Sequence, residues 1–151
     1  MRDRVARMLA PLVARIALLV ARAIVKGRDD SKKLRELRLD VLAGESLEQV
    51  EHFQEYGFTS APHDDAEAIL LSLGGDRGHS VVIATGDRRY RIPVVKGEVA
   101  MFTDEGDKIH LKRGNEIHIV TDTLRVTCGA VELVLDTTGL TVTGGTVDFN
   151  S

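Results

Sequence analysis

The sequence has little of several things that common classes of protein need. It contains one cysteine, no tryptophan, two tyrosines and four phenylalanines in 151 residues. A single cysteine, Cys128, excludes a disulfide within the chain and a zinc site built from cysteines. Because large aromatic anchors are scarce, the interior must be built from many small branched side chains, which suits β-structure. We therefore expect a mainly β protein.

Neither an excess of basic charge nor an uninterrupted hydrophobic run is present. The 20 Lys and Arg residues against 23 Asp and Glu residues give a net charge of −3, whereas nucleic-acid binding usually needs a strongly basic face. We expect no nucleic-acid partner. The apolar residues 10–25 are interrupted by Arg15 and Arg22, and a central arginine costs about 2.5–3.5 kcal/mol on membrane-insertion scales. With no small-x-small cleavage site after it, this stretch is neither a membrane span nor an export signal.

Residues 2–26 carry the pattern of an amphipathic helix. Apolar residues recur in alternating steps of four and three, the spacing of a coiled-coil seam: Val5, Leu9, Leu12, Ile16, Leu19 and Ala23. Met8 and Val13 widen this seam beyond what a two-stranded coil needs, so the helix needs several neighbours, either its own copies or other proteins. We assign residues 1–27 to an N-terminal helix for docking or trimerisation. A helix lying on a membrane surface is the competing interpretation.

Residues 28–103 are predicted to form an OB-fold-like barrel of short strands, although a small β-sandwich fits the pattern nearly as well. Loops suited to positive φ separate apolar runs, and the strand candidates are residues 34–42, 49–56, 66–72, 80–84 and 90–95. An OB-like barrel can bind single-stranded nucleic acid through aromatic platforms and a basic groove. The residues that could do so here are Phe53, Tyr56, Phe58, Arg88, Arg89 and Arg91.

Residues 104–151 show short segments in which every second residue is apolar, and the occupied parity changes at turn-like breaks. These segments recur about every eight residues, and the breaks are residues 121–123, 129–130, 136–139 and 144–145. One copy cannot cover so many small apolar faces or close the sheet edges, so partner chains are needed. Three copies around a common axis would do so, and a single-chain β-solenoid is the alternative. The predicted trimer core is Ile109, Leu111, Ile117, Ile119, Leu124, Val126, Val131, Leu133, Leu135, Leu140, Val142, Val147 and Phe149.

No arrangement typical of catalysis or of a cofactor site is found in the sequence. His110 and His118 alternate with apolar neighbours, so we expect both to face outward and to be exposed. Cys128 shares the parity of Val126, which favours a buried core cysteine over a nucleophile. The run 63–65 (His-Asp-Asp) is interpreted as a solvated loop rather than a metal site. We therefore expect no enzyme, no metal and no cofactor.

Several spaced segments resemble the Mu-like phage central spike proteins, the baseplate assembly protein V family of contractile tails. They are residues 52–62 (HFQEYGFTSAP), 74–77 (GGDR), 86–91 (GDRRYR), 97–99 (GEV) and 104–106 (DEG). The resemblance implies a homotrimer with an OB-fold collar and an intertwined triple-stranded β-helix below it. It also implies a non-enzymatic virion protein at the tip of the tail baseplate, made in the host cytoplasm. Such a spike caps the tail tube beneath the hub and pierces the host outer membrane when the sheath contracts.

Two further expectations follow from the resemblance. The N-terminal helix should contact the baseplate hub or tail-tube proteins through Leu9, Leu12, Ile16 and Leu19. Related spikes often end in a His-x-His motif that holds iron, but residues 144–151 (GGTVDFNS) contain no histidine, so we expect no apex metal and either a blunt tip or a separate tip protein. The alternatives are the spike of a contractile bacteriocin or prophage-derived injection device and, in a different class, an OB-type oligonucleotide-binding module with an oligomerising β-tail.

Overall fold

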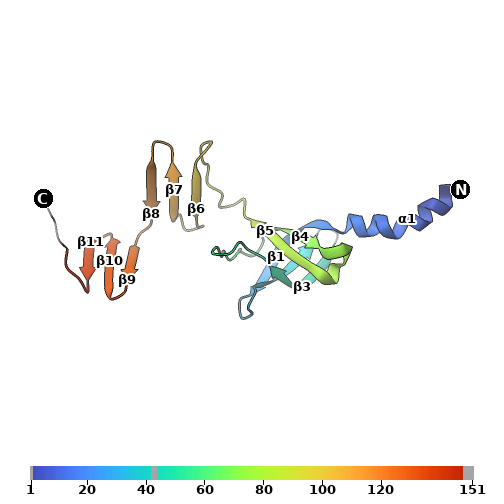
Figure 1. Ribbon diagram of the computed structural model, residues 1–151, viewed down its shortest axis with the longest axis horizontal. Coiled ribbons are helices and arrows are strands. Elements are labelled where there is room, and N and C mark those ends of the chain that lie inside the picture. The colour runs from blue at the N-terminus through green and yellow to red at the C-terminus, as the bar shows by residue number, and fades with distance from the viewer. Residues whose placement is uncertain (1, 42–43, 148–151) are drawn as a thin grey trace. The chain divides into compact units, whose positions relative to one another are not determined.

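A closed barrel of five strands dominates the first part of the computed structural model, which describes residues 2–41 and 44–147 (Figure 1). Its strands are β1 (Val20–Asp29), β2 (Glu36–Val41), β3 (Glu45–His52), β4 (Glu67–Ser72) and β5 (Ser80–Gly86). Their order around the barrel is β1-β2-β3-β5-β4, with β1 paired to β4 to close it. Only the β3–β5 pair among these is parallel. The barrel is of the predicted OB-like kind, not a sandwich.

The barrel interior is filled by small branched side chains, as the shortage of aromatics requires. Strand β2 shows the principle: Leu37, Leu39 and Val41 are buried, while Arg38 and Asp40 between them are exposed. The buried apolar core is Ala23, Val25, Leu37, Leu39, Val41, Val50, Ala66, Ala68, Leu70 and Val82. His52 is a buried polar exception. Burial lowers the pKa of its imidazole, and the nearby positive charge of Arg35 lowers it further.

The N-terminal helix is shorter than the sequence predicted. Helix α1 spans Arg2–Ala17, and residues 20–29 form β1 instead of continuing the helix. From residue 20 the apolar pattern also fits a strand, because Ala21, Ala23 and Val25 turn toward the core. Pairing with both β2 and β4 closes the barrel, and this tertiary pairing overrides the weak helical preference. Leu19 therefore lies between helix and strand, where its carbonyl accepts a hydrogen bond from Ser72 N at 2.8 Å.

The fifth predicted strand, residues 90–95, is also wrong. This segment has no strand structure, and Pro93 lacks the N–H that a sheet ladder requires. The barrel nevertheless has the predicted five strands, because β1 takes the place of the predicted strand at residues 90–95. The chain divides into two compact units, Met1–Arg89 and Tyr90–Ser151. Strand β1 crosses the predicted boundary between residues 27 and 28.

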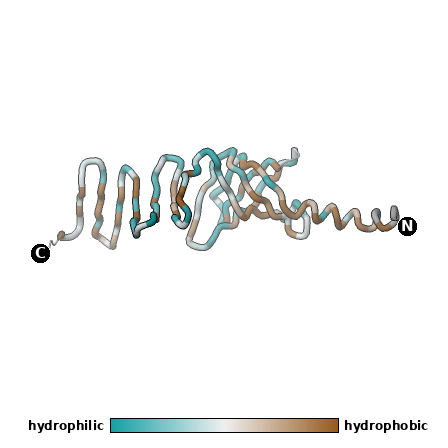
Figure 2. Tube along the Cα trace, turned by 90° about the horizontal axis from the view of Figure 1, so that it is seen from above, coloured by the Kyte–Doolittle hydropathy of each residue, from teal (hydrophilic) through white to brown (hydrophobic). Residues whose placement is uncertain are grey.

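The second unit contains two three-stranded antiparallel sheets, ordered β6-β7-β8 and β11-β10-β9. The strands are β6 (Val99–Phe102), β7 (Lys108–Lys112), β8 (Glu116–Val120), β9 (Leu124–Cys128), β10 (Val131–Asp136) and β11 (Gly139–Thr143). Both are meanders of sequential strands rather than the parallel coils of a β-solenoid. Figure 2 shows hydrophobic and hydrophilic positions alternating along these strands. The predicted short strands that recur about every eight residues are confirmed for residues 108–143, and the predicted breaks at 121–123, 129–130 and 136–139 fall at connections between them.

Strand β6 was not predicted, and its sheet crosses the predicted boundary between residues 103 and 104. The predicted core residue Phe149 lies outside the described residues. Among residues 90–147, which are all described, none is buried within the single chain.

Candidate assembly surface

The first sheet of the second unit presents one wholly aliphatic face. In an antiparallel sheet, directly opposed residues lie on the same face. Register places Val99, Leu111 and Ile117 in one row across the three strands. Met101, Ile109 and Ile119 form the second row, two positions along each strand and hence on the same face. This face is called apolar face A.

The second sheet repeats the arrangement with the opposite parity in β9. Leu124, Leu135 and Leu140 form one row across its strands. The next row on the same face is Val126, Leu133 and Val142. We call this apolar face B. The eleven predicted core residues from Ile109 to Val142 thus gather on these two faces, with Val131 opposite Cys128 at the margin of face B.

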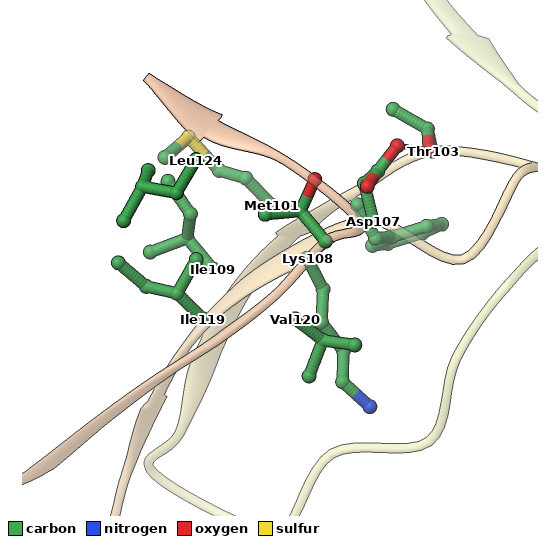
Figure 3. A pocket seen from close by; sticks show the side chains of 10 residues that line it. Met101, Thr103, Asp107, Lys108, Ile109, Ile119, Val120 and Leu124 are labelled. Atoms are coloured by element: carbon green, nitrogen blue, oxygen red, sulfur yellow. Dashed lines mark hydrogen bonds between the residues drawn. The ribbon is translucent and has the colours of Figure 1, made fainter. Parts of the chain in front are cut away.

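The two faces meet at the crossing from β8 to β9. Met101, Ile109, Ile119 and Leu124 line a cleft of about 330 Å³. Figure 3 shows these four side chains gathered on one side of the ribbon, while Lys108 and Val120 point to the other side. The change of parity at residues 121–123 therefore keeps the apolar side chains of successive strands on one continuous surface.

Both apolar faces are exposed in the single chain. Ile117 is 67% exposed and Leu140 is 61% exposed, and Ile109, Leu111, Ile119, Val126 and Leu135 are exposed as well. Removing apolar surface from water is favourable by about 25 cal/mol per Å², and contiguous patches of this kind mark interaction sites. The arrangement can thus associate with a complementary apolar surface.

Val99 and Met101 belong to face A but were not predicted as core residues. They lay inside the segment assigned to the barrel, so their alternation was not joined to that of Ile109 and Leu111. The signal was present, because all four residues occupy odd positions in the sequence.

The opposite face of the first sheet is mixed: one row is Phe102, Lys108 and Val120, and in another His110 lies between Ala100 and His118. His118 is exposed, as predicted. The predicted exposure of His110 is wrong, because its side chain is only 13% exposed. Its Nε2 is hydrogen-bonded to Oε2 of Glu98 at 2.9 Å. The irregular segment before β6 covers this histidine, which strand alternation alone does not reveal.

The Glu98 carboxylate holds that segment onto the sheet. Its Oε2 accepts hydrogen bonds from His110 and from the backbone N–H of Val95 at 3.1 Å, and its Oε1 accepts one from the N–H of Arg113 at 3.1 Å. The backbone bonds from Arg113 and Val95, followed by the bond from His110, lower the pKa of Glu98 because they favour the ionised form.

Glu98→Gln is expected to lower the melting temperature of the second unit, because an amide cannot accept all three bonds in the same geometry. A carboxylate whose pKa is lowered by folding stabilises the protein above its ordinary pKa, and this contribution is lost as the pH falls through the lowered value. The difference in melting temperature from the unaltered chain should therefore be present at pH 7 and shrink toward about pH 3. Glu105→Gln, which removes the same charge from an exposed loop residue, is the control. Equal effects from the two variants would contradict this role for Glu98.

Other residues singled out in the sequence are accounted for individually. Cys128 was expected to be buried, but it is exposed within the single chain. Asp65 forms an ion pair with Lys26 at 2.6 Å, and the Lys26 ammonium lowers the pKa of that carboxyl. No group of three or more metal-binding side chains occurs in residues 2–41 and 44–147. Within the same residues, no helix has the length and apolar character needed to cross a membrane.

The candidate oligonucleotide-binding residues do not form one surface of free cations and aromatics. Phe53, Tyr56 and Phe58 are exposed in the loop between β3 and β4. However, the guanidinium of Arg88 is 2.7 Å from Glu67, and that of Arg89 is 2.6 Å from Asp87. These ion pairs neutralise much of the basic run.

Comparison with known proteins places this architecture in a family. A family model described as "Bacteriophage Mu Gp45, N-terminal" matches residues 22–89. The "Baseplate puncturing device gp45" of Escherichia phage Mu is 32% identical over 139 residues, covering 91% of this chain and 70% of that protein. The chain belongs to the bacteriophage Mu gp45 family. Another member, the "Mu-like prophage FluMu protein gp45" of Haemophilus influenzae, is 34% identical over 146 residues, covering 91% of this chain and 79% of the relative.

The matched region of the gp45 family model coincides with the barrel. It begins two residues inside β1 and ends at Arg89, where the first unit ends. The two gp45 relatives extend the similarity through most of the second unit, because each alignment covers 91% of the chain. The family resemblance predicted from the sequence is confirmed.

Proposed function

We propose that this chain is the central spike of a contractile phage tail baseplate. Three copies form a homotrimer in which the barrels make a collar and the second units wind into an intertwined triple-stranded β-helix. The spike caps the tail tube below the hub and pierces the host outer membrane when the sheath contracts. The work is mechanical, without an enzymatic step, in a virion protein that is made in the host cytoplasm.

One observation carries the proposal. Residues 90–147 include two aliphatic sheet faces, yet none of these residues is buried in the single chain. The apolar face of a sheet must be buried against another element, and the edge strands of such a sheet present unpaired backbone groups. Partner copies that cover faces A and B and pair those edges would remove both defects. Chains intertwined in this way unfold slowly, which suits a part that transmits force.

The printed name of the phage Mu relative, a baseplate puncturing device, supports the same role. The name of the second relative refers to a Mu-like prophage. It favours one second candidate, the equivalent spike of a prophage-derived or bacteriocin-like contractile injection device. The physical role of the chain is the same in both.

Helix α1 is proposed to dock into the hub or tail-tube proteins. Leu9, Leu12 and Ile16 are about half exposed on the helix, so they are available to a partner. Leu19, in the link between α1 and β1, is proposed to dock with them through its side chain, while its backbone carbonyl bonds to the barrel.

The test of the proposal is the mass of the native particle. Light scattering on the purified chain at micromolar concentration should give three times the mass of the 16.5 kDa single chain. This species should persist in detergent until it is strongly heated. The mass of a single chain would overturn both the trimer and the spike.

A further inference from the structure

The outer surface of the barrel carries an apolar strip on the sheet formed by β1, β4 and β5. Val20, Leu71 and Val81 are opposed in register and therefore form one outward row. Val20 and Ile83 are 58% and 51% exposed. The set, called the barrel strip, is Val20, Ile69, Leu71, Val81, Ile83 and Ala84.

Residues 68–71 of strand β4 are apolar on both faces of the strand. Ala68 and Leu70 point into the barrel core, whereas Ile69 and Leu71, which alternate with them, belong to the barrel strip. A barrel strand with a solvated outer face normally alternates apolar and polar residues, and a continuous apolar run is typical of a strand covered on both faces. Ile69 and Leu71 are only half-buried in the single chain, so the outer face of this run is left incompletely covered.

The borders of the barrel strip carry charges of opposite sign. In the closed strand order, the strip begins on β1 at one side and ends on β5 at the other, where β3 is the next strand. Arg22 on β1 lies opposite Ile69 and its side chain is 64% exposed. Its guanidinium is 3.9 Å from Glu67, which Arg88 also contacts at 2.7 Å, so these two arginines against one glutamate keep one positive charge in excess. Glu51 on β3 lies opposite Val81, and both Glu51 and Glu48 are exposed. One copy's basic border is thus complementary to another copy's acidic border, as a head-to-tail contact in a closed ring requires.

We propose that the barrel strip is an interface between copies of this chain. The strips of the copies face a common axis, and the β1 border of each barrel meets the β3 border of the next. This inference rests on the proposed homotrimer. Only residues 87–89 separate the end of β5 from the second unit, so copies gathered by faces A and B hold their barrel strips within reach of one another.

Thiol accessibility in the full-length protein tests the interface. Ile83→Cys places a thiol in the barrel strip, and Leu34→Cys places one in the β1–β2 loop, each with Cys128→Ala to remove the natural cysteine. In the single chain these two positions are 51% and 40% exposed, so an uncovered strip gives similar rates of reaction with a charged maleimide. We expect the Ile83→Cys thiol to react at least about tenfold more slowly than the Leu34→Cys thiol. In denaturant the two rates should be equal.

The mass of each sample separates the possible failures. Similar rates in a sample with the mass of a trimer would overturn the barrel interface and leave the proposed spike intact. Similar rates in a monomeric sample would mean that the proposed homotrimer has failed and the interface with it. Protection of the Ile83→Cys thiol that appears only after a baseplate hub protein is added would also overturn the inference, because the cover would then be another protein.

A second pair of variants keeps the inference testable without labelling. Ile83→Asp should lower the melting temperature of the barrel, because three charges would be placed in one apolar contact. Leu34→Asp, at a comparably exposed site outside the strip, should change it little. Equal small effects in a trimer would contradict the interface.

Discussion

Ile117→Asp is expected to convert the proposed trimer into monomers. Ile117 belongs to face A and is 67% exposed in the single chain, so within a monomer its replacement should change stability by no more than about 0.5 kcal/mol. In a trimer whose core contains face A, each copy would lose roughly 1.5–3 kcal/mol of apolar burial. Three carboxylates would in addition be brought together without partners in a low-dielectric interior. The measurement is the mass by light scattering across a range of protein concentrations.

The matched control is His118→Asp. His118 is the next residue of β8, is exposed, and lies on the opposite face of the same sheet. It receives the same new carboxyl group on the same strand, so the added negative charge alone does not separate the two variants. The His118→Asp chain should remain a trimer. A trimeric Ile117→Asp protein would mean that face A lies outside the assembly core, and dissociation of both variants alike would mean that the effect is not specific to that face.

Much of the second unit could be predicted from the sequence because the alternation of apolar residues that defines each of its strands is a local pattern. Each strand is only a few residues long, and the parity of its apolar residues changes at residues that form turns, such as Gly129 (φ +60). The faces of β7 to β11 follow from that alternation alone. Coverage by irregular segments does not follow from it, and the low exposure of the His110 side chain beside Glu98 was therefore not predicted.

Residues 18–29 could not be assigned correctly for a different reason. Their apolar positions fit the four-and-three spacing of a helix and also the alternation of a strand. The choice is made by β4, whose residues 67–71 pair with Val20 to Ile24 and are more than forty positions away in sequence. A local pattern contains no information about a partner so distant, and β-structure depends strongly on such context.

The connection between α1 and the barrel could likewise not be predicted from the sequence pattern. It depends on the close approach of the Arg15 backbone to one glycine, Gly75. Gly75 has φ +73, and a Cβ at this position would lie 2.4 Å from the carbonyl oxygen of Arg15. Around it, the guanidinium of Arg77 donates to the carbonyl of Leu18 at 3.3 Å and to Ser72 Oγ at 3.1 Å. The end of α1 thus contacts the barrel through the backbone of Arg15 and Leu18, which cannot rearrange as a flexible side chain can.

Gly75→Ala is expected to detach α1 from the barrel, and the adjacent Gly74→Ala is its control. Gly74 has φ +64 with nothing within 4 Å of the added Cβ, so its replacement brings only the strain of a left-handed conformation, roughly 1–2 kcal/mol. Gly75→Ala adds to that strain a clash with the Arg15 backbone, which only displacement of α1 relieves. We expect Gly75→Ala to speed amide hydrogen exchange at residues 14–19 strongly and Gly74→Ala to leave it near that of the unaltered chain. Equal exchange rates in the two variants would show that the direction of α1 does not depend on this contact. Helix α1 would then have to dock without being oriented by the barrel.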